Sequence, residues 1–188
     1  TRYWIDKKFM NSNGLDNQIF KFSFAQKTGL LYQSEAEEIA FLNSFPEYIN
    51  NRELDLLDLY GCDSLEDLKF FINTNGNVFF DLRKWVSALS EFDFGFGTRL
   101  HGTISMLNSG IPAVLAWHDS RTREAAEFAS IPSVPANGFQ LTKQSLENLY
   151  SSTNIESYFL RRIEIKTIFN RFLISNGLKP KLLKEAHF

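Results

Sequence analysis

Apolar and polar positions alternate in blocks between residues 78 and 135, and the blocks predict short strands separated by helices. Strands are expected over residues 78–80, 92–97 and 111–117, helices over 82–89, 100–107 and 123–130, and a last extended segment over 132–135. Trp85 and Leu89, four residues apart, share one helix face. Because strands separated by helices of about ten residues pair through right-handed crossovers, this order predicts a parallel sheet and a Rossmann-like α/β domain.

The flanking segments extend this pattern in both directions. The apolar run Leu30–Tyr32 precedes Ser34 and Glu37, which are spaced as a capping box, so a strand followed by a helix is expected there. After Asn154, apolar residues recur near helical spacing and predict a long amphipathic helix that packs back on the core. We therefore expect a Rossmann-like domain over residues 1–150 and a C-terminal helical extension over 151–188.

Composition narrows the class of protein. The 188 residues are 44% hydrophobic, which suffices for a sizeable core, and no apolar run approaches the roughly 20 residues of a membrane span. The single cysteine, Cys62, leaves no internal disulfide and is expected to be structural, so a reducing compartment, the cytoplasm, is predicted.

Charge is distributed unevenly along the chain. Residues 1–150 carry 13 basic and 19 acidic residues, which argues against nucleic-acid binding, whereas residues 151–188 carry 7 basic and 3 acidic residues. The basic tail, from Arg161 to Lys184, could attract the inner face of an acidic membrane as a peripheral contact. A solvated helix face is the favoured interpretation, since the charges are spread widely. The acidic run from Glu35 to Asp67, with ten acidic residues and one basic residue, is expected to be helical and exposed.

A candidate anion site follows the strand expected at residues 92–97. The backbone N–H groups of the next helix start, with Gly97 and Thr98 leading into it, can bind an anion, and Arg99 adds a planar cation that grips two oxygens. His101 can transfer a proton near neutral pH. In a parallel sheet the next strand opens onto the same edge. We therefore expect substrate binding also by the basic residues that follow that strand: His118, Arg121 and Arg123.

Structural alternatives apply to the same residues. Arg121 and Arg123 could simply pair with Glu124 or Glu127, and His101 could satisfy a backbone carbonyl. Asp119 is expected to cap the next helix or to orient an arginine. No metal is expected, because no further His or Cys lies near His118.

The spacing of the glycines argues against a dinucleotide-binding fingerprint. Gly95 and Gly97 follow a predicted strand, and Asp119 lies about 20 residues onward, as that fingerprint requires. The third glycine, Gly102, comes five residues after Gly97 instead of three. A bulky side chain, Arg99, also stands where a pyrophosphate would approach.

At these residues the sequence resembles the polysaccharide pyruvyl transferase family. That family has a Gly-x-Arg-Leu/Ile-His segment after a strand, a helix of small residues that ends Ala-Gly-x-Pro, an apolar strand and a polar segment with a basic residue. The matching segments are residues 97–102, 108–112, 113–117 and 118–121, and the similarity extends over residues 77–135. Many members have lysine where this sequence has Arg121, which keeps the charge and changes the geometry.

The resemblance implies a fold and a reaction. The fold is that of B-type glycosyltransferases, with this segment in the carboxyl-terminal Rossmann-like half. The reaction is transfer of a pyruvyl group from phosphoenolpyruvate to a sugar of a cell-surface polysaccharide or its lipid-linked precursor, as a ketal, without a cofactor. His101 matches the catalytic histidine, and Arg99 and Arg121 match the anion-binding residues.

Two further expectations follow. Residues 1–76 are too few for the family's amino-terminal domain, so the chain either is a fragment, consistent with Thr1, or lacks part of the machinery and is inactive alone. Two other functions stay open: a sugar-nucleotide glycosyltransferase of the same architecture, and a non-catalytic anion-binding module.

Overall fold

The computed structural model describes residues 14–33, Ile39 and residues 53–178, which form two compact units. Unit 1 comprises residues up to 82 together with 137–145, and unit 2 comprises residues 83–136 together with 146–188. Both units combine helices with a small parallel sheet, so the predicted α/β class is confirmed. Each unit has its own core of buried apolar side chains.

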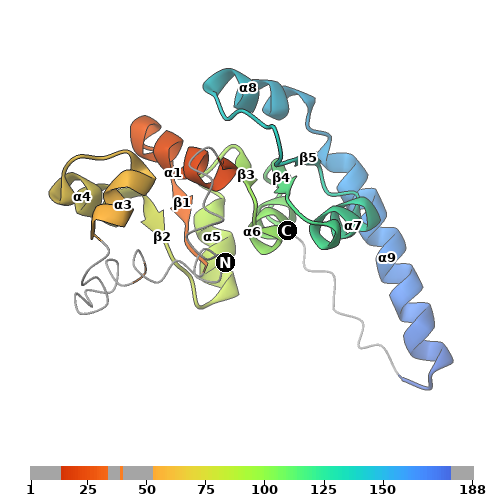
Figure 1. Cartoon of the computed structure of the whole chain (residues 1–188). Helices are drawn as coiled ribbons and strands as arrows, with labels where there is room; N and C mark the ends of the chain where they lie inside the picture. Colours follow the sequence, from red (N-terminus) through yellow and green to blue (C-terminus); the bar gives the residue numbers. More distant parts are fainter. Residues whose placement is uncertain (1–13, 34–38, 40–52, 179–188) are drawn as a thin grey trace. The chain divides into compact units, whose positions relative to one another are not determined.

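Unit 1 is a helical cluster on a two-stranded sheet (Figure 1). Its elements in chain order are α1 (Leu15–Gln26), β1 (Leu30–Leu31), α3 (Glu53–Tyr60), α4 (Leu65–Asn75) and β2 (Gly76–Asn77). β1 and β2 pair in parallel, with Leu30 opposite Gly76. In the core the hydroxyls of Tyr32 and Tyr60, both buried, share a hydrogen bond of 2.9 Å, so neither polar group is left unsatisfied.

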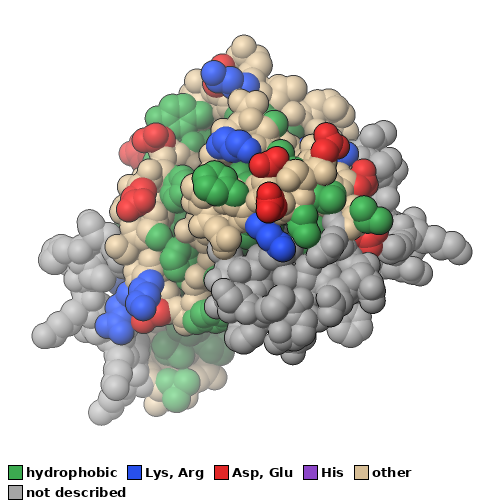
Figure 2. Space-filling model, turned by 90° about the vertical axis from the view of Figure 1, so that its left-hand side faces the viewer, with side chains coloured by type: hydrophobic (Ala, Val, Ile, Leu, Met, Phe, Trp, Pro, Cys, Tyr) green, Lys and Arg blue, Asp and Glu red, His purple; other side chains and the backbone are tan. Residues whose placement is uncertain are grey.

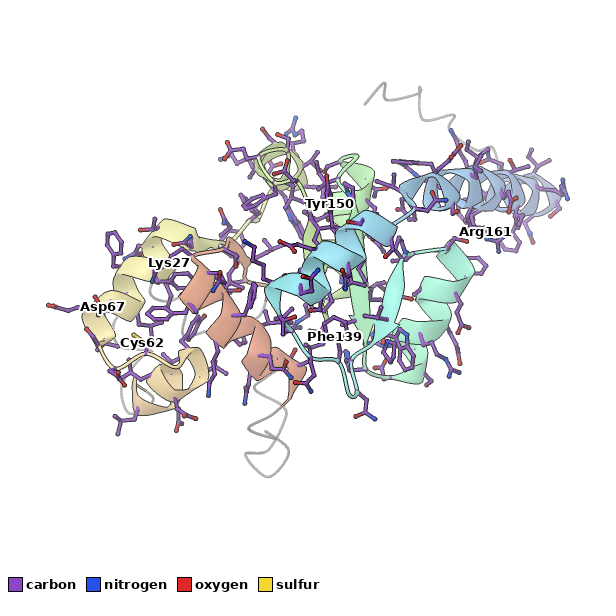
Figure 3. The ribbon with its side chains drawn as sticks, turned by 90° about the horizontal axis from the view of Figure 1, so that it is seen from above. Lys27, Cys62, Asp67, Phe139, Tyr150 and Arg161 are labelled. Atoms are coloured by element: carbon purple, nitrogen blue, oxygen red, sulfur yellow. The ribbon has the colours of Figure 1, made fainter. Side chains whose placement is uncertain are left out.

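A distant segment also belongs to unit 1. The side chain of Gln18 on α1 donates to the carbonyl of Phe139 at 3.4 Å and accepts from the amide of Leu141 at 2.8 Å. Figure 3 labels Phe139 in the connection that precedes α8 (Lys143–Ser152). One glutamine amide thus satisfies two backbone groups more than 120 residues away in the sequence.

The first strand predicted after residue 77 is displaced in the structure. No strand is found at residues 78–80, and β2 lies just before them, because the Tyr32 amide donates to the Asn77 carbonyl at 2.9 Å and continues the pairing with β1. Phe80 is 88% exposed. Leu30–Leu31 forms the expected strand, and the helix expected from Ser34 lies outside the described residues.

The close approach at Gly76 gives a first prediction. A Cβ there would meet the Ile72 carbonyl oxygen and would come within 2.6 Å of the Tyr32 ring. Gly76→Ala is therefore expected to lower the free energy of unfolding by about 1–3 kcal/mol, measured by urea denaturation. Gly97→Ala is the control: nothing lies within 4 Å of its added Cβ, and a change of about 0.5 kcal/mol or less is expected. Equal losses in both variants would contradict the steric explanation.

Unit 2 contains the strand–helix repeats predicted from the sequence. Its elements in chain order are α5 (Leu82–Leu89), β3 (Gly95–Gly97), α6 (Leu100–Asn108), β4 (Ala113–Trp117), α7 (Ser120–Ala129), β5 (Ser133–Pro135), α8 and α9 (Ile155–Ser175). The three strands are parallel in the order β3-β4-β5, with Gly97 opposite Leu115 and Trp117 opposite Pro135. Both crossovers contain one helix, as expected for a parallel sheet.

β4 is the centre of unit 2. Leu115, in the middle of the strand, is fully buried and belongs to one core cluster with Leu107 of α6 and Ala126 of α7. Val114 and Ala116 alternate with these residues on the other face of the sheet and are also buried, so both faces of β4 are covered.

α9 differs from the helix predicted over this segment. Near its start Tyr158 is buried and donates a hydrogen bond of 2.9 Å to the side chain of Asn108 on α6. Burial raises the pKa of Tyr158, and the nearby Arg162 offsets part of that rise. The expected packing on the core is found at the start of the helix, where Ile155 and Phe159 lie against the core cluster. It does not extend to the later turns, where Ile168, Phe169 and Phe172 are more than half exposed.

Candidate functional site

The candidate site lies at the carboxyl edge of the three-stranded sheet. β3 ends at Gly97 and leads into α6, and β4 ends at Trp117 and leads into α7. Because β3 and β4 are parallel neighbours, about 4.8 Å apart as in any sheet, both helices start at this same edge. The topology thus brings together the two segments that the sequence singled out, residues 97–101 and 118–123.

The start of α6 offers backbone donors. Arg99 is its N-cap residue in an extended conformation, and the Arg99 carbonyl accepts hydrogen bonds of 3.2 Å from both the amide and the hydroxyl of Thr103. No cap hydrogen bond comes from the Arg99 side chain. The N–H groups of the first turn have no carbonyl one turn earlier to bind, and the helix dipole makes this end positive. The start of α6 can therefore accept an anion.

The two glycines of β3 serve different purposes. An added Cβ at Gly95 would lie 2.8 Å from the side chain of Met106, so this glycine allows α6 to approach the strand closely. At Gly97, one residue before the loop to α6, an added Cβ meets nothing within 4 Å. Gly97 therefore leaves open space beside the start of α6.

Asp119 organises the start of α7. One carboxylate oxygen accepts hydrogen bonds from the amide of Thr122 at 2.7 Å and from its hydroxyl at 2.6 Å. The Asp119 amide in turn donates to the Thr122 hydroxyl oxygen at 3.4 Å, which completes a capping box. The other oxygen lies 3.8 Å from Nε2 of His118 and 3.7 Å from a terminal guanidinium nitrogen of Arg121. The prediction that Asp119 caps the helix is confirmed, and Asp119 also lies beside an arginine, as expected.

The hydrogen bonds to Asp119 make a contribution to stability that depends on pH. The Thr122 hydroxyl and amide, followed by the charges of His118 and Arg121, hold the pKa of Asp119 below its ordinary value of 3.8, although burial opposes them. Because the pKa is depressed in the folded state, this stabilisation is complete above about 3.8 and is lost as the pH falls through the folded pKa.

This dependence gives a second prediction. Asp119→Asn keeps an oxygen for the cap and removes the charge, so its deficit in melting temperature against the parent chain should shrink as the pH is lowered from 7 to about 3. Thr122→Val removes the hydroxyl that contributes most, and should reduce the same pH dependence. A difference in melting temperature from the parent chain that stays constant with pH in both variants would contradict a stabilising role for the Asp119 charge.

The remaining predicted site residues differ in their exposure and in their side-chain contacts. His101 is exposed on the first turn of α6, Thr98 and Arg99 are half-buried, and Arg121 is 83% exposed at its side chain. Arg123 contacts its own helix and strand: its Nε lies 3.6 Å from Glu127, as the alternative interpretation predicted, and its guanidinium lies over the Trp117 ring at 5.8 Å. His101 and Arg121 therefore have exposed side chains at this sheet edge, and Arg99 lies half-buried at the start of α6.

Two buried threonines that hold residues of the candidate site were not predicted from the sequence. Thr103 is buried and binds the Arg99 carbonyl, and Thr122 is buried and binds Asp119. Thr122 could have been found, because an Asp followed three residues later by a polar side chain that reaches back is a helix-start signal. Thr103 could not have been found in this way, because a threonine four residues after an arginine is common in helices and does not indicate a site.

Comparison of the chain with models of protein families, with curated proteins and with solved structures finds no match. Within the described ranges, no three or more His, Cys, Asp or Glu side chains are grouped so that they could hold a metal ion. In the same ranges no helix is both long and apolar enough to cross a membrane.

Proposed function

We propose that this chain belongs to an enzyme that transfers the pyruvyl group of phosphoenolpyruvate to a sugar. The observation that carries the proposal is the start of α6, where backbone donors, Arg99 and His101 lie at the same sheet edge as Arg121. Phosphoenolpyruvate bears a carboxylate and a phosphate on three carbons. A helix start and two guanidinium groups match that charge, since each can bind an oxyanion.

The reaction defines roles for these groups. A proton is added to the methylene carbon of phosphoenolpyruvate, a sugar hydroxyl bonds to the neighbouring carbon and loses its proton, and phosphate leaves; a second hydroxyl closes the ketal. His101, exposed on the first turn of α6, performs one of the proton transfers. Arg99 and Arg121 hold the anion and stabilise the departing phosphate. A terminal nitrogen of the Arg121 guanidinium lies 3.7 Å from the Asp119 carboxylate.

The proposed architecture is the carboxyl-terminal half of a B-type glycosyltransferase fold. Three parallel strands in sequential order with one helix in each crossover are compatible with such a Rossmann-like half. In that architecture the acceptor, a sugar or lipid-linked oligosaccharide, reaches the carboxyl edge of the sheet, where ligands of open α/β sheets bind. The proposed setting is the cytoplasm, where phosphoenolpyruvate is available as a donor.

Donor binding can be measured without knowing the acceptor, which gives a third prediction. Calorimetry of the full chain should show binding of phosphoenolpyruvate, and Arg99→Ala should weaken it by about 10–100-fold, the loss expected for a charge-assisted hydrogen bond. Arg83→Ala removes an exposed arginine from α5 and should leave the affinity unchanged. Inorganic phosphate should bind the same site more weakly because it lacks the carboxylate.

The same experiment separates the proposal from its alternatives. Release of phosphate from phosphoenolpyruvate that depends on an added sugar, with the ketal detected by mass spectrometry, supports pyruvyl transfer. Binding of phosphoenolpyruvate without turnover, over a panel of sugars and nucleotide sugars, favours an anion-binding module. Binding of nucleotide sugars with no affinity for phosphoenolpyruvate favours a glycosyltransferase and contradicts the proposal.

A further inference from the structure

The C-terminal half of α9 carries an apolar stripe, here called the distal stripe, formed by Ile165, Ile168, Phe169 and Phe172. The spacing i, i+3, i+4, i+7 places these four side chains on one side of the helix. Ile168, Phe169 and Phe172 are 54%, 57% and 58% exposed. In Figures 1 and 3 this half of α9 runs on beyond α7, the helix that α9 contacts near its start.

The base of α9 is firmly held on unit 2. Tyr158 binds Asn108, and Nε of Arg161, labelled in Figure 3, donates to the Phe128 carbonyl of α7 at 2.7 Å. Tyr158 lies on the same side of the helix as the distal stripe, seven residues before Ile165. The stripe therefore continues a face that is covered at the base of the helix and uncovered farther out.

The exposed apolar residues of α9 are not confined to one side. Leu160, Ile163 and Ile174 are 58%, 63% and 64% exposed and lie away from the stripe, given about 100° of rotation per residue. Helices that lie on a membrane surface have a polar face opposite a single apolar face. A helix that is apolar on several sides is typical of one enclosed by protein. This distribution favours a protein partner over a lipid surface.

Charge indicates which protein surface fits. α9 carries four basic residues, Arg161, Arg162, Lys166 and Arg171, and two acidic residues, Glu156 and Glu164. The exposed side chains within residues 54–70 of unit 1 are here called the acidic surface. Its exposed carboxylates are Asp55, Asp58, Asp63, Glu66 and Asp67, whereas Lys69 is the sole basic residue in that range.

The acidic surface also presents apolar side chains. Leu54 on α3 is 81% exposed and Phe70 on α4 is 74% exposed. Figure 2 looks onto the side of the molecule that carries these two helices, and there Asp and Glu side chains lie next to hydrophobic ones. A basic helix with an apolar stripe and an acidic surface with apolar side chains are complementary, and every copy of the chain carries both.

We propose that two copies of the chain bind each other, with the distal stripe of each α9 packed on the acidic surface of the other copy. In the proposed dimer a two-fold axis relates the two copies and makes the two contacts equivalent. The five exposed apolar side chains of one copy contribute roughly 100 Å² each, so the two contacts together bury about 1,000 Å², which is the lower end of the size range of specific interfaces.

Analytical ultracentrifugation of the full chain tests the proposal with three variants. Phe169→Ser/Phe172→Ser removes the stripe, Leu54→Ser/Phe70→Ser removes the apolar part of the acidic surface, and Phe80→Ser is the control because its side chain is 88% exposed outside both surfaces. The parent chain and the control should dimerise equally. Each double variant should have a dissociation constant raised at least about 100-fold, with unchanged circular dichroism.

Mixing the two double variants adds a sharper test. A mixed dimer keeps one intact contact, between the normal α9 of one chain and the normal acidic surface of the other, so mixing should restore dimers that neither variant forms alone. Raising the salt concentration should weaken the parent dimer. Three results would overturn the proposal. The first is a parent chain that stays monomeric at all concentrations, whether or not it co-sediments with phosphatidylserine-containing vesicles. The others are a dimer that is unaffected by loss of the distal stripe, and a mixture of the two double variants that forms no dimers. None of these measurements depends on pyruvyl transfer.

Discussion

Replacing His101 by glutamine is expected to lower turnover by about 10²–10⁴-fold and to leave the affinity for phosphoenolpyruvate nearly unchanged. Glutamine is polar, of similar length and a good helix former, so the first turn of α6 should keep its conformation. It cannot exchange a proton near neutral pH, and general acid–base catalysis contributes that range of rate. The measurement is the rate of phosphate release with an acceptor sugar, paired with calorimetry of donor binding.

A readout independent of turnover accompanies this prediction. The ring protons of His101, followed by nuclear magnetic resonance, should shift when phosphoenolpyruvate is added, and those of His118 should respond less if the donor lies mainly at the start of α6. A His101→Gln variant with full turnover would contradict the proposed role. A His101 resonance that ignores the donor would contradict the location of the site.

Truncating Leu107 to alanine is expected to lower the free energy of unfolding by about 2–5 kcal/mol, the largest effect on stability that we predict. Leu107 is fully buried on α6 and packs in one cluster with Leu115 of β4 and Tyr158 of α9. Alanine there removes three heavy atoms from contact with a strand and a helix, and leaves a cavity that the surrounding elements cannot fill completely. Domains of ordinary stability have only about 5–15 kcal/mol to lose, so this variant should approach unfolding near body temperature.

Leu82→Ala is the matched control for this truncation. Leu82 begins α5 and is 65% exposed, so the same chemical change should alter the free energy of unfolding by about 0.5 kcal/mol or less. Urea denaturation with a common slope for the three proteins is the measurement. Equal free energies of unfolding for the Leu107 and Leu82 variants would contradict the conclusion that the buried cluster around Leu107 stabilises unit 2.

The strand–helix order of unit 2 could be predicted because local signals mark its boundaries. Gly110 and Pro112 separate α6 from β4, and Asp119 caps α7 with a side chain close to it in sequence. Two strands are shorter than expected: β3 begins at Gly95 and β4 at Ala113. Their bounds depend on pairing, since the first bond between them joins the Gly95 amide to the Pro112 carbonyl. An apolar run in the sequence does not indicate which of its residues form backbone hydrogen bonds with a neighbouring strand.

Contacts between distant residues could not be predicted in the same way. The side chain of Gln18 binds the backbone at Phe139 and Leu141, and nothing in the local sequence of either segment indicates it. The exposure of the C-terminal half of α9 could not be predicted either. The spacing of apolar residues predicts an amphipathic helix, but it does not indicate which surface packs against its apolar face. In the candidate site, the sheet edge could be predicted from the topology, and the pairing of Arg123 with Glu127 was one of two alternatives that the i, i+4 spacing allowed.

The first turn of α6 also makes the candidate site observable by hydrogen–deuterium exchange. The amide protons of Leu100, His101 and Gly102 have no acceptor earlier in the helix, so they should exchange quickly with solvent, whereas those of the fully buried centre of β4 should exchange only through large openings of unit 2. An anion seated there would slow these three amides alone. Their protection would then report occupancy directly, with no label and no assumption about chemistry.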